Sequence, residues 1–413
     1  MRKRLFIFTI LAVVFMMCFI SCSSEMSEGG SGRGDGYSGS APSFGESGGY
    51  ENKNPDEGNQ EDVIIPAGQL TACAYDDNEH FAFWQGLLSS NQEGNGIFKF
   101  YYDNFAFKTL NRIQIKVPTN MDVLVHLVNE DKKVIFTSIP DANGIAYLYP
   151  QAESEEYNIC LEYTKNGEID VTMQYETIKG DTEFIVDATY EKNDVIQLMF
   201  VIDTTGSMGD EIRYLKSEII DIISQVKQEF SNSTIELAIM LYRDKVDDYV
   251  TKYSDFSTDI KAQQEFLSKQ SANGGGDFPE AVDVALEEAA SKQWTSKAKT
   301  KILVHVADAP AHDKNVQSWE NTSKKLASQG IRVITVASSG IDQKTEYFFR
   351  NQSIMTNGKY VYLTDDSGIG NSHLEATVEE KPVVEFLNAC LVRLIKGYHT
   401  GIFEEPIYYG QKQ

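Results

Sequence analysis

Five consecutive residues, Asp203-Thr204-Thr205-Gly206-Ser207, carry the side chains of this sequence best suited to chemistry. Asp203, Thr205 and Ser207 recur at every second position, so on an extended loop their oxygens point to one face. One carboxylate and two hydroxyls are hard oxygen donors, which suit Mg²⁺, an ion that takes six ligands and keeps some waters. The alternative is that Asp203 caps the following helix and the hydroxyls bind backbone groups. The spacing predicts a magnesium site, which would also accept Mn²⁺ or Ca²⁺.

The elements that must position these residues begin with an apolar run, Val195 to Ile202. A strand without polar alternation is typical of a parallel sheet covered on both faces. Further apolar runs at 234–242, 300–307 and 331–337 alternate with segments of helical spacing, to about residue 400. We therefore expect residues 193–400 to form an α/β doubly wound, mostly parallel sheet, of Rossmann-like type. In such folds ligands bind at the carboxyl ends of strands, where Asp203 and Asp308 both lie.

These motifs resemble a von Willebrand factor type A (VWA) domain over residues 195–396. Asp203, Thr205 and Ser207 match the first line of its metal-ion-dependent adhesion site (MIDAS), D-x-S-x-S, with Thr in place of the first Ser. Asp308, in VHVADAPAH, matches the aspartate that this family carries at the tip of a later strand. The resemblance implies that a divalent metal held there binds a carboxylate of a protein partner.

The middle loop of the site departs from the family pattern. Glycine stands where the family usually has threonine, and Asp277 follows it in GGGDFPEA. The resemblance to a variant of bacterial members makes Asp277 a candidate metal ligand. Asp277 and Glu280 also have the spacing of a capping box, with Pro279 in the first turn, so a helix cap is the alternative.

Two further polar positions lie near the same sheet edge. Arg243 and Asp244 end the second predicted strand, and we expect them to form a structural ion pair. His312 follows Asp308 by four residues, and we expect a loop histidine that hydrogen-bonds nearby backbone there rather than a ligand of a transition metal.

The chain opens with a basic segment and an apolar run, residues 1–21, which is typical of an export signal. Phe19-Ile20-Ser21-Cys22 resembles a bacterial lipobox, which implies that Cys22 is lipidated and anchors the protein to a membrane without spanning it. Residues 22–65 are rich in Gly, Ser, Glu and Asn and predict a flexible tether. The expected location is the bacterial cell envelope, periplasmic or at the cell surface.

Residues 66–185 alternate apolar with polar positions in several short runs, such as 112–117, 122–128 and 157–163. Asn166-Gly167 is a strong signal for a tight hairpin turn. We expect an all-β immunoglobulin-like sandwich, and 125–150 resembles the transthyretin-like, carboxypeptidase-regulatory-like sandwiches of exported proteins. Cys73 and Cys160 would lie in this region, either as free thiols or as a disulfide.

Charge and missing motifs narrow the function. The net charge is −24, which disfavours nucleic acid as a partner and suits divalent cations. No HExxH, GxxxxGK[ST], GxSxG or GxGxxG motif occurs, so we expect a binding or adhesion protein and not an enzyme. The alternative is an accessory subunit or a metal-dependent hydrolase that uses the same site with a separate catalytic partner. Residues 401–413 would form a tail.

Overall fold

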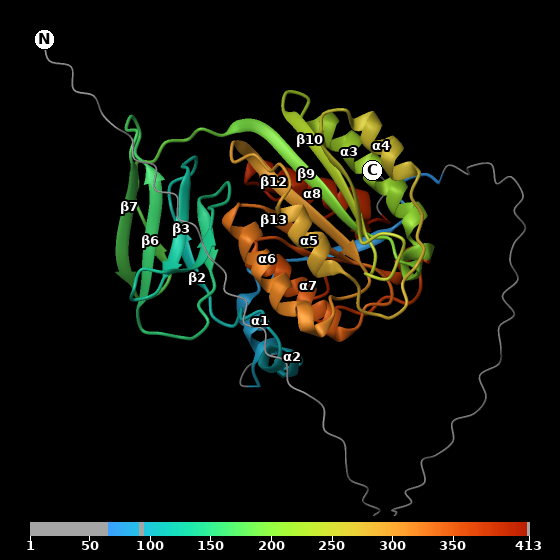
Figure 1. Cartoon of the computed structure of the whole chain (residues 1–413), viewed down its shortest axis with the longest axis horizontal. Helices are drawn as coiled ribbons and strands as arrows, with labels where there is room; N and C mark the ends of the chain where they lie inside the picture. Colours follow the sequence, from blue (N-terminus) through green and yellow to red (C-terminus); the bar gives the residue numbers. More distant parts are fainter. Residues whose placement is uncertain (1–64, 91–94, 411–413) are drawn as a thin grey trace, which may run out of the picture. The chain divides into compact units, whose positions relative to one another are not determined.

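The computed structural model describes residues 65–90 and 95–410 (Figure 1). The chain divides into two units, Met1–Glu61 and Asp62–Gln413, and every described residue belongs to the second. The export signal, Cys22 and the tether up to residue 64 lie outside the described residues. Within the described part, no helix is long and apolar enough to cross a bilayer.

An eight-stranded mixed sheet carries the candidate site. Its order is β11-β10-β9-β12-β13-β14-β1-β15. The five strands from β10 to β14 in this order pair in parallel, as predicted for a doubly wound fold, whereas β11, β1 and β15 are antiparallel to their neighbours. The strands are β9 (Asn193–Asp203), β10 (Thr234–Tyr242), β11 (Thr251–Ser257), β12 (Ala298–Ala307), β13 (Arg332–Ala337), β14 (Tyr360–Leu363), β1 (Thr71–Tyr75) and β15 (Glu385–Phe386).

Helices cover both faces of this sheet (Figure 1). Along β9, Leu198, Phe200 and Ile202 belong to one buried cluster, with α3 and α8, and Met199 and Val201 belong to the other, with α5, α6 and α7. This two-sided burial explains why the strand sequence is continuously apolar. The helices are α3 (Ile212–Glu229), α4 (Ile260–Ser268), α5 (Val282–Ala290), α6 (Val316–Ser328), α7 (Gln343–Met355) and α8 (Leu387–Thr400), with short 3₁₀ turns η1 (Gly206–Asp210), η2 (Asp313–Asn315) and η3 (Asp365–Ser367).

The segment 66–185 is not all β, and part of it belongs to the large sheet. Strand β1 pairs with β14, and α1 (Phe81–Leu88) and α2 (Lys99–Asn104) follow it. Cys73 lies opposite Tyr362 in this pairing. The large sheet therefore includes a strand from the predicted 66–185 segment, in addition to strands from 193–400.

The remaining strands of this segment form two small sheets, ordered β5-β2-β8 and β4-β3-β6-β7. They are β2 (Ile113–Lys116), β3 (Val123–Val128), β4 (Val134–Ser138), β5 (Ile145–Leu148), β6 (Tyr157–Thr164), β7 (Val171–Ile178) and β8 (Thr182–Glu183). Gly167 has φ of 80° between β6 and β7, as a tight turn requires. The immunoglobulin-like type of this region stays a prediction. Cys73 and Cys160 are buried free thiols, so they form no disulfide here.

Candidate metal centre

The predicted oxygen cluster lies where β9 ends. Asp203 is the last residue of β9, and the backbone N–H and the hydroxyl of Thr205 donate to its Oδ1 at 2.8 and 2.7 Å. The Thr205 and Ser207 hydroxyl oxygens are 3.2 Å apart. The alternate spacing of these residues therefore brings their oxygens together, as expected from the sequence.

Asp308 comes from the neighbouring strand. It follows β12, which pairs in parallel with β9, so both aspartates lie at the same edge of the sheet. Asp203 and Asp308 are 0 % and 3 % exposed. Two buried carboxylates at one edge repel each other unless a cation or a proton lies between them.

Several carboxylate oxygens here have no hydrogen-bond partner. Among the described residues, four buried carboxylate oxygens lack one: Asp203 Oδ2, Asp308 Oδ1, Glu280 Oε2 and Asp122 Oδ1. Asp122 Oδ1 lies 3.4 Å from the Lys192 ammonium, whereas no cation pairs with the other three. A buried, unpartnered carboxylate is costly, and three of them at one site fit a divalent cation.

The pKa values of these three carboxyl groups are all raised by burial. Burial raises the pKa of Asp203 to about 7, and the charge of Asp308 adds to the effect. Burial also raises the pKa of Asp308 to about 6, while a hydrogen bond from Ser207 acts in the opposite direction. The largest shift is at Glu280, where burial and then the charge of Asp203 raise the pKa to about 9. Each carboxylate is therefore harder to ionise while no cation is present.

Glu280 is the member of this group that the sequence did not single out as a ligand. A Cβ built on Gly275 would lie 3.2 Å from Glu280 Oε1 and 3.3 Å from Thr205 Cβ, so the Glu280 carboxylate and Thr205 flank the same backbone. The Glu280 N–H donates to the carbonyl of Pro310 at 2.9 Å, which fixes Glu280 beside the loop after β12. In the sequence, Glu280 was noted only for its capping-box spacing from Asp277, which suggested a role at the start of a helix and not at a metal.

Asp277 does not cap the helix. Helix α5 begins at Val282 with Ala281 as N-cap and no side-chain capping bond, because the chain first pairs Glu280 with Ala311. Asp277 is exposed and makes no hydrogen bond or ion pair within the described part of the chain. The capping prediction is wrong, and the structure does not bring Asp277 to the other carboxylates.

Glycines hold the middle loop against the end of β9. Gly274 and Gly275 have φ of 76° and 77°, and a side chain on Gly274 would collide with the Asp247 carboxylate. The Gly275 N–H donates to both Asp247 oxygens, at 3.1 and 3.0 Å. The Gly206 N–H donates to the carbonyl of Gly274 at 3.0 Å, which ties this loop to the oxygen cluster.

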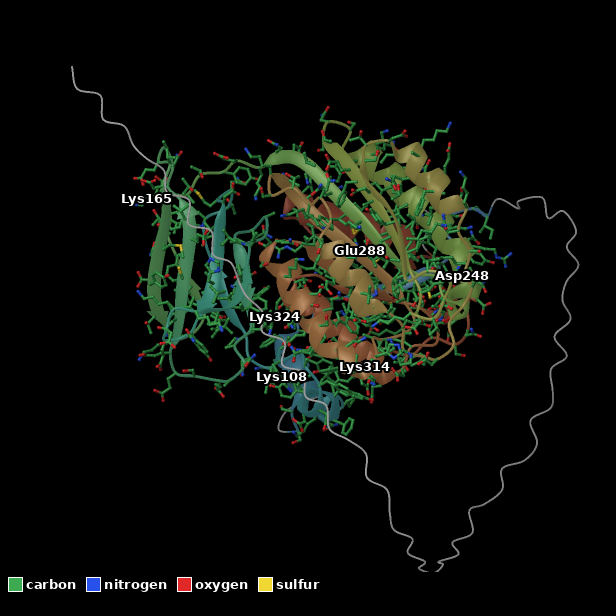
Figure 2. The ribbon with its side chains drawn as sticks, in the orientation of Figure 1. Lys108, Lys165, Asp248, Glu288, Lys314 and Lys324 are labelled. Atoms are coloured by element: carbon green, nitrogen blue, oxygen red, sulfur yellow. The ribbon has the colours of Figure 1, made fainter. Side chains whose placement is uncertain are left out.

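The rim residues pair differently from the prediction. Arg243 does not pair with Asp244; its Nε donates to the carbonyl of Thr204 at 3.1 Å, and its Nη1 lies 4.0 Å from Asp248, which is labelled in Figure 2. Asp244 instead lies 3.1 Å from His312 Nε2. His312 is therefore a hydrogen-bonded loop histidine, but its partner is a carboxylate.

The carboxylates of Asp203, Asp308 and Glu280 do not form a complete metal site by themselves. Within residues 65–90 and 95–410, no group of three or more His, Cys, Asp or Glu side chains is arranged to hold a metal. A site here must therefore use the hydroxyls of Thr205 and Ser207 together with water, as Mg²⁺ commonly does.

Comparison with solved structures gives two weak likenesses. The conserved hypothetical protein BatB from Bacteroides thetaiotaomicron is 14 % identical, with a TM-score of 0.30, covering 40 % of this chain and 89 % of that one. An aerotolerance-related membrane protein from Bacteroides fragilis NCTC 9343, with multiple mutations to serines, is 13 % identical, with a TM-score of 0.32, covering 50 % and 100 %.

Two curated relatives match by sequence. Alpha-protein kinase vwkA of Dictyostelium discoideum is 24 % identical over 255 residues, which are 60 % of this chain and 40 % of the kinase. The putative ariadne-like RING finger protein R811 of Acanthamoeba polyphaga mimivirus is 27 % identical over 187 residues, 41 % and 18 % of the two chains. The chain thus spans less than half the length of these relatives. A family model described as von Willebrand factor A domain matches residues 197–371, so this part of the chain is a von Willebrand factor A domain.

Proposed function

We propose that the VWA domain binds one divalent cation, Mg²⁺ in the first place, and uses it to bind a carboxylate of a protein partner. The observation that carries the proposal is the set of unpartnered buried oxygens on Asp203, Asp308 and Glu280 beside the hydroxyls of Thr205 and Ser207. Oxygen donors of this kind suit Mg²⁺, Mn²⁺ and Ca²⁺ rather than softer metals.

Each residue has a separate task in this proposal. Asp203 and Asp308 supply negative charge from adjacent strands, and Thr205 and Ser207 supply neutral oxygens. Asp203 Oδ1 already accepts two hydrogen bonds from Thr205, so Oδ2 is the oxygen free for a cation. A cation bound there would offer a Lewis-acidic position to an outside carboxylate.

Glu280 sets a condition on that partner. A third carboxylate near the ion lowers its net charge and weakens its attraction for an outside acid. An acidic partner therefore binds best when Glu280 is protonated or turned away from the ion. Asp277, exposed on the same loop, has no contact among the described residues, and the proposal gives it no part in holding the ion.

The proposal also includes a location and a class. We infer an exported protein, held at the cell envelope by a lipid on Cys22, that acts as a binding or adhesion protein and not as an enzyme. The support is the sequence of residues 1–22 and the missing catalytic motifs. Mass spectrometry of the protein purified from membranes tests the lipid: a diacylglycerol adduct on Cys22 supports the anchor, and an unmodified Cys22 contradicts it.

Calorimetry with MgCl₂ and MnCl₂ tests the metal site, using residues 23–413 and the Asp203→Ala variant. We expect about one ion per chain for the wild type and no measurable uptake by the variant. Circular dichroism in EDTA should show that the variant is folded, because Asp203 is the last residue of β9 and the apolar core is formed by the residues before it. A wild-type protein that takes up neither ion contradicts the proposal.

Partner capture tests the second step. Immobilised wild-type protein should retain its partner in Mg²⁺ and release it in EDTA, and Asp203→Ala should retain nothing in either buffer. A partner that stays bound in EDTA would show that contacts other than the metal hold it.

A further inference from the structure

A second candidate site lies at the opposite ends of the same strands. A cavity of about 90 Å³ is lined by five basic side chains: Lys192, Lys299, Lys301, Arg332 and His399. Lys301 is the fourth residue of β12, and Arg332 is the first residue of β13. Seven residues of extended strand separate Lys301 from Asp308, roughly 23 Å, so this cavity is distinct from the candidate metal centre.

Two of these cations are buried without an acidic partner. Lys301 and Arg332 are 8 % and 6 % exposed, and within the described residues neither has a carboxylate within 4.0 Å. Their contacts are with carbonyl oxygens: Lys301 Nζ donates to Gln329, and Arg332 donates to Ile139 at 2.7 Å and to Thr356 at 3.3 Å. Buried charges are normally paired, so these two are exceptional in a chain of net charge −24.

The nearest acids are engaged elsewhere. Asp122 lies 3.4 Å from Lys192 and accepts from the Glu191 N–H at 2.9 Å. Asp141 accepts from the N–H groups of Asn143 and Ile145 in its own turn, at 2.9 and 3.0 Å. Both acids also line the cavity, but neither lies within 4.0 Å of Lys301 or Arg332, and against the four Lys and Arg side chains of the lining they leave an excess of positive charge.

Helix ends give part of the missing negative charge. Gln329 and Thr356 are the C-caps of α6 and α7, and a helix C-terminus carries about half a negative charge. That partial charge explains how the cations are tolerated but leaves a net positive cavity. Burial lowers the pKa of Lys301 to about 8, and the charges of Lys192 and Arg332 lower it further, as expected for cations that still lack a counter-ion.

We propose that this cavity binds a small dianionic oxyanion, phosphate or sulfate, between Lys301 and Arg332. The cavity has room for one, because a single water needs only about 10–15 Å³ of such space. Two buried cations balance two negative charges, and Arg332 and Lys301 both donate well to oxyanions. Thr300, also in the lining, is held by His399, with the hydroxyl oxygen 2.8 Å from Nδ1, so the wall of the cavity is fixed before a ligand enters.

Thermal unfolding in EDTA tests this site separately from the metal centre. Sodium phosphate, sodium sulfate and sodium chloride are compared at equal ionic strength, on the wild type, on Lys301→Met and on Lys314→Met. Lys314 is the control, because it is exposed and does not line the cavity; it is labelled in Figure 2. The measured quantity is the gain in Tm over chloride, so a general effect of a substitution on stability does not enter.

Phosphate or sulfate at about a hundredfold excess over Kd should raise the Tm of the wild type and of Lys314→Met by about 5 °C. Lys301→Met should show no gain. Calorimetry with inorganic phosphate should give one site per chain in the wild type. Equal gains in all three proteins, or no gain over chloride in the wild type, would overturn the proposal. The role of Lys301 would then be limited to its hydrogen bond with the C-cap of α6.

Discussion

At the scale of single residues, the carboxylates at the end of β9 differ in what surrounds them. Glu280 is 2 % exposed and has an unpartnered oxygen, whereas Asp277, three residues earlier, is exposed and has no contact among the described residues. The pKa of Glu280 is raised to about 9 by burial and by the nearby aspartates, so the metal-free protein holds this carboxyl protonated at pH 7. A cation that takes Glu280 as a ligand must therefore displace the proton of this carboxyl group.

We predict that Glu280→Gln weakens Mg²⁺ binding by about tenfold and removes about one proton from those released on binding. The amide matches the protonated carboxyl in shape but cannot ionise, so stability in EDTA at pH 7 should change little. Calorimetry in buffers of different ionisation enthalpy measures both quantities. Asp277→Asn is the matched control and should behave as the wild type. If Glu280→Gln binds Mg²⁺ with unchanged affinity and proton release, Glu280 takes no part in the site.

The sequence was informative about this site wherever the chemistry follows from local spacing. Asp203, Thr205 and Ser207 could be grouped because extended backbone repeats every two residues, and Asp308 because parallel strands end at one edge. Glu280 could not, because its burial depends on Gly274 and Gly275 folding the loop over Thr205. The pairing of His312 with Asp244 likewise depends on two loops that are far apart in the sequence.

At the scale of elements, a histidine joins the loop after β14 to the start of α3. His373 Nδ1 lies 2.7 Å from Asp365 and Nε2 lies 3.2 Å from Glu211, which itself accepts from the Ser339 N–H at 3.0 Å. Burial lowers the pKa of His373, but the contacts with Glu211 and Asp365 outweigh it, and the pKa is raised above its usual value. The protonated histidine thus stabilises this junction.

We predict that His373 contributes a pH-dependent part of the stability. A group with a raised folded pKa stabilises fully below its unfolded pKa, about 6.5, and this contribution is lost as the pH rises through the folded pKa. Urea unfolding of the wild type and of His373→Gln from pH 5.5 to 9 measures it. The wild type should exceed the variant most at pH 5.5, with the difference shrinking above about pH 6.5. A difference that stays constant with pH would show that the histidine acts only by packing.

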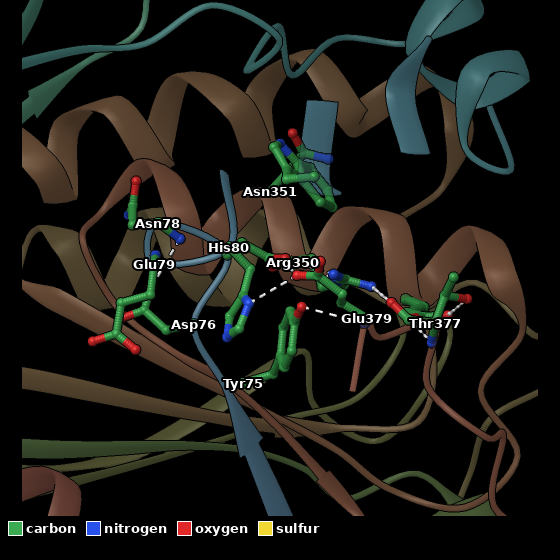
Figure 3. A network of polar contacts seen from close by, with 12 residues as sticks. Tyr75, Asp76, Asn78, Glu79, His80, Arg350, Asn351, Thr377 and Glu379 are labelled. Atoms are coloured by element: carbon green, nitrogen blue, oxygen red, sulfur yellow. Dashed lines mark hydrogen bonds and ion pairs between the residues drawn. The ribbon is translucent and has the colours of Figure 1, made fainter. Parts of the chain in front are cut away.

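A buried arginine of helix α7, Arg350, forms an ion pair with the segment after β1 (Figure 3). Arg350 is fully buried; its Nε donates to Asp77 at 3.0 Å and its Nη1 to Glu346 at 3.0 Å. Both carboxylates are themselves buried, so the guanidinium is the counter-charge for two acids. Removal of one partner from such a network costs more than the network itself contributes.

We predict that Arg350→Met lowers the free energy of unfolding by about 3–5 kcal/mol, because it leaves the two acids without a cation. Urea unfolding at pH 7 measures the loss. The triple variant Arg350→Met, Asp77→Asn, Glu346→Gln should recover part of it, since no uncompensated charge remains. A triple variant no more stable than Arg350→Met would mean that packing of the arginine, rather than charge, holds α7.

The helices and strands of the VWA domain followed from periodicity, but strand partners did not. Continuous apolar runs predicted β9, β10, β12 and β13 close to their observed bounds, and helical spacing predicted the helices between them. Strand β1, TACAY, is five residues long, and its alternation does not reveal whether it joins a small sheet or the large one. Its partner β14 lies almost three hundred residues away in the sequence.

At the scale of the whole molecule, β1 makes the large sheet depend on residues that precede the VWA match. Leu70 and Ala72 are buried in the cluster that contains α3 and α8. The carboxylate of Glu218, on α3, accepts from the N–H groups of Gly68, Gln69 and Leu70 at 2.9, 2.8 and 3.1 Å. Without this segment the carboxylate of Glu218 loses these three donors, and β14 becomes an open edge.

We predict that residues 193–413 do not form a stable monomer, whereas residues 65–413 unfold cooperatively with the Tm of residues 23–413. The shorter chain loses β1, the donors to Glu218 and the pairing of Arg350 with Asp77. Size-exclusion chromatography and thermal unfolding measure the outcome, and we expect aggregation or a Tm at least 10 °C lower for the shorter chain. Glu218→Gln in that chain should recover part of the Tm, because it removes a charge that has lost its three donors. If 193–413 is monomeric and as stable as the longer chains, the sheet is stable without β1, and the prediction is wrong.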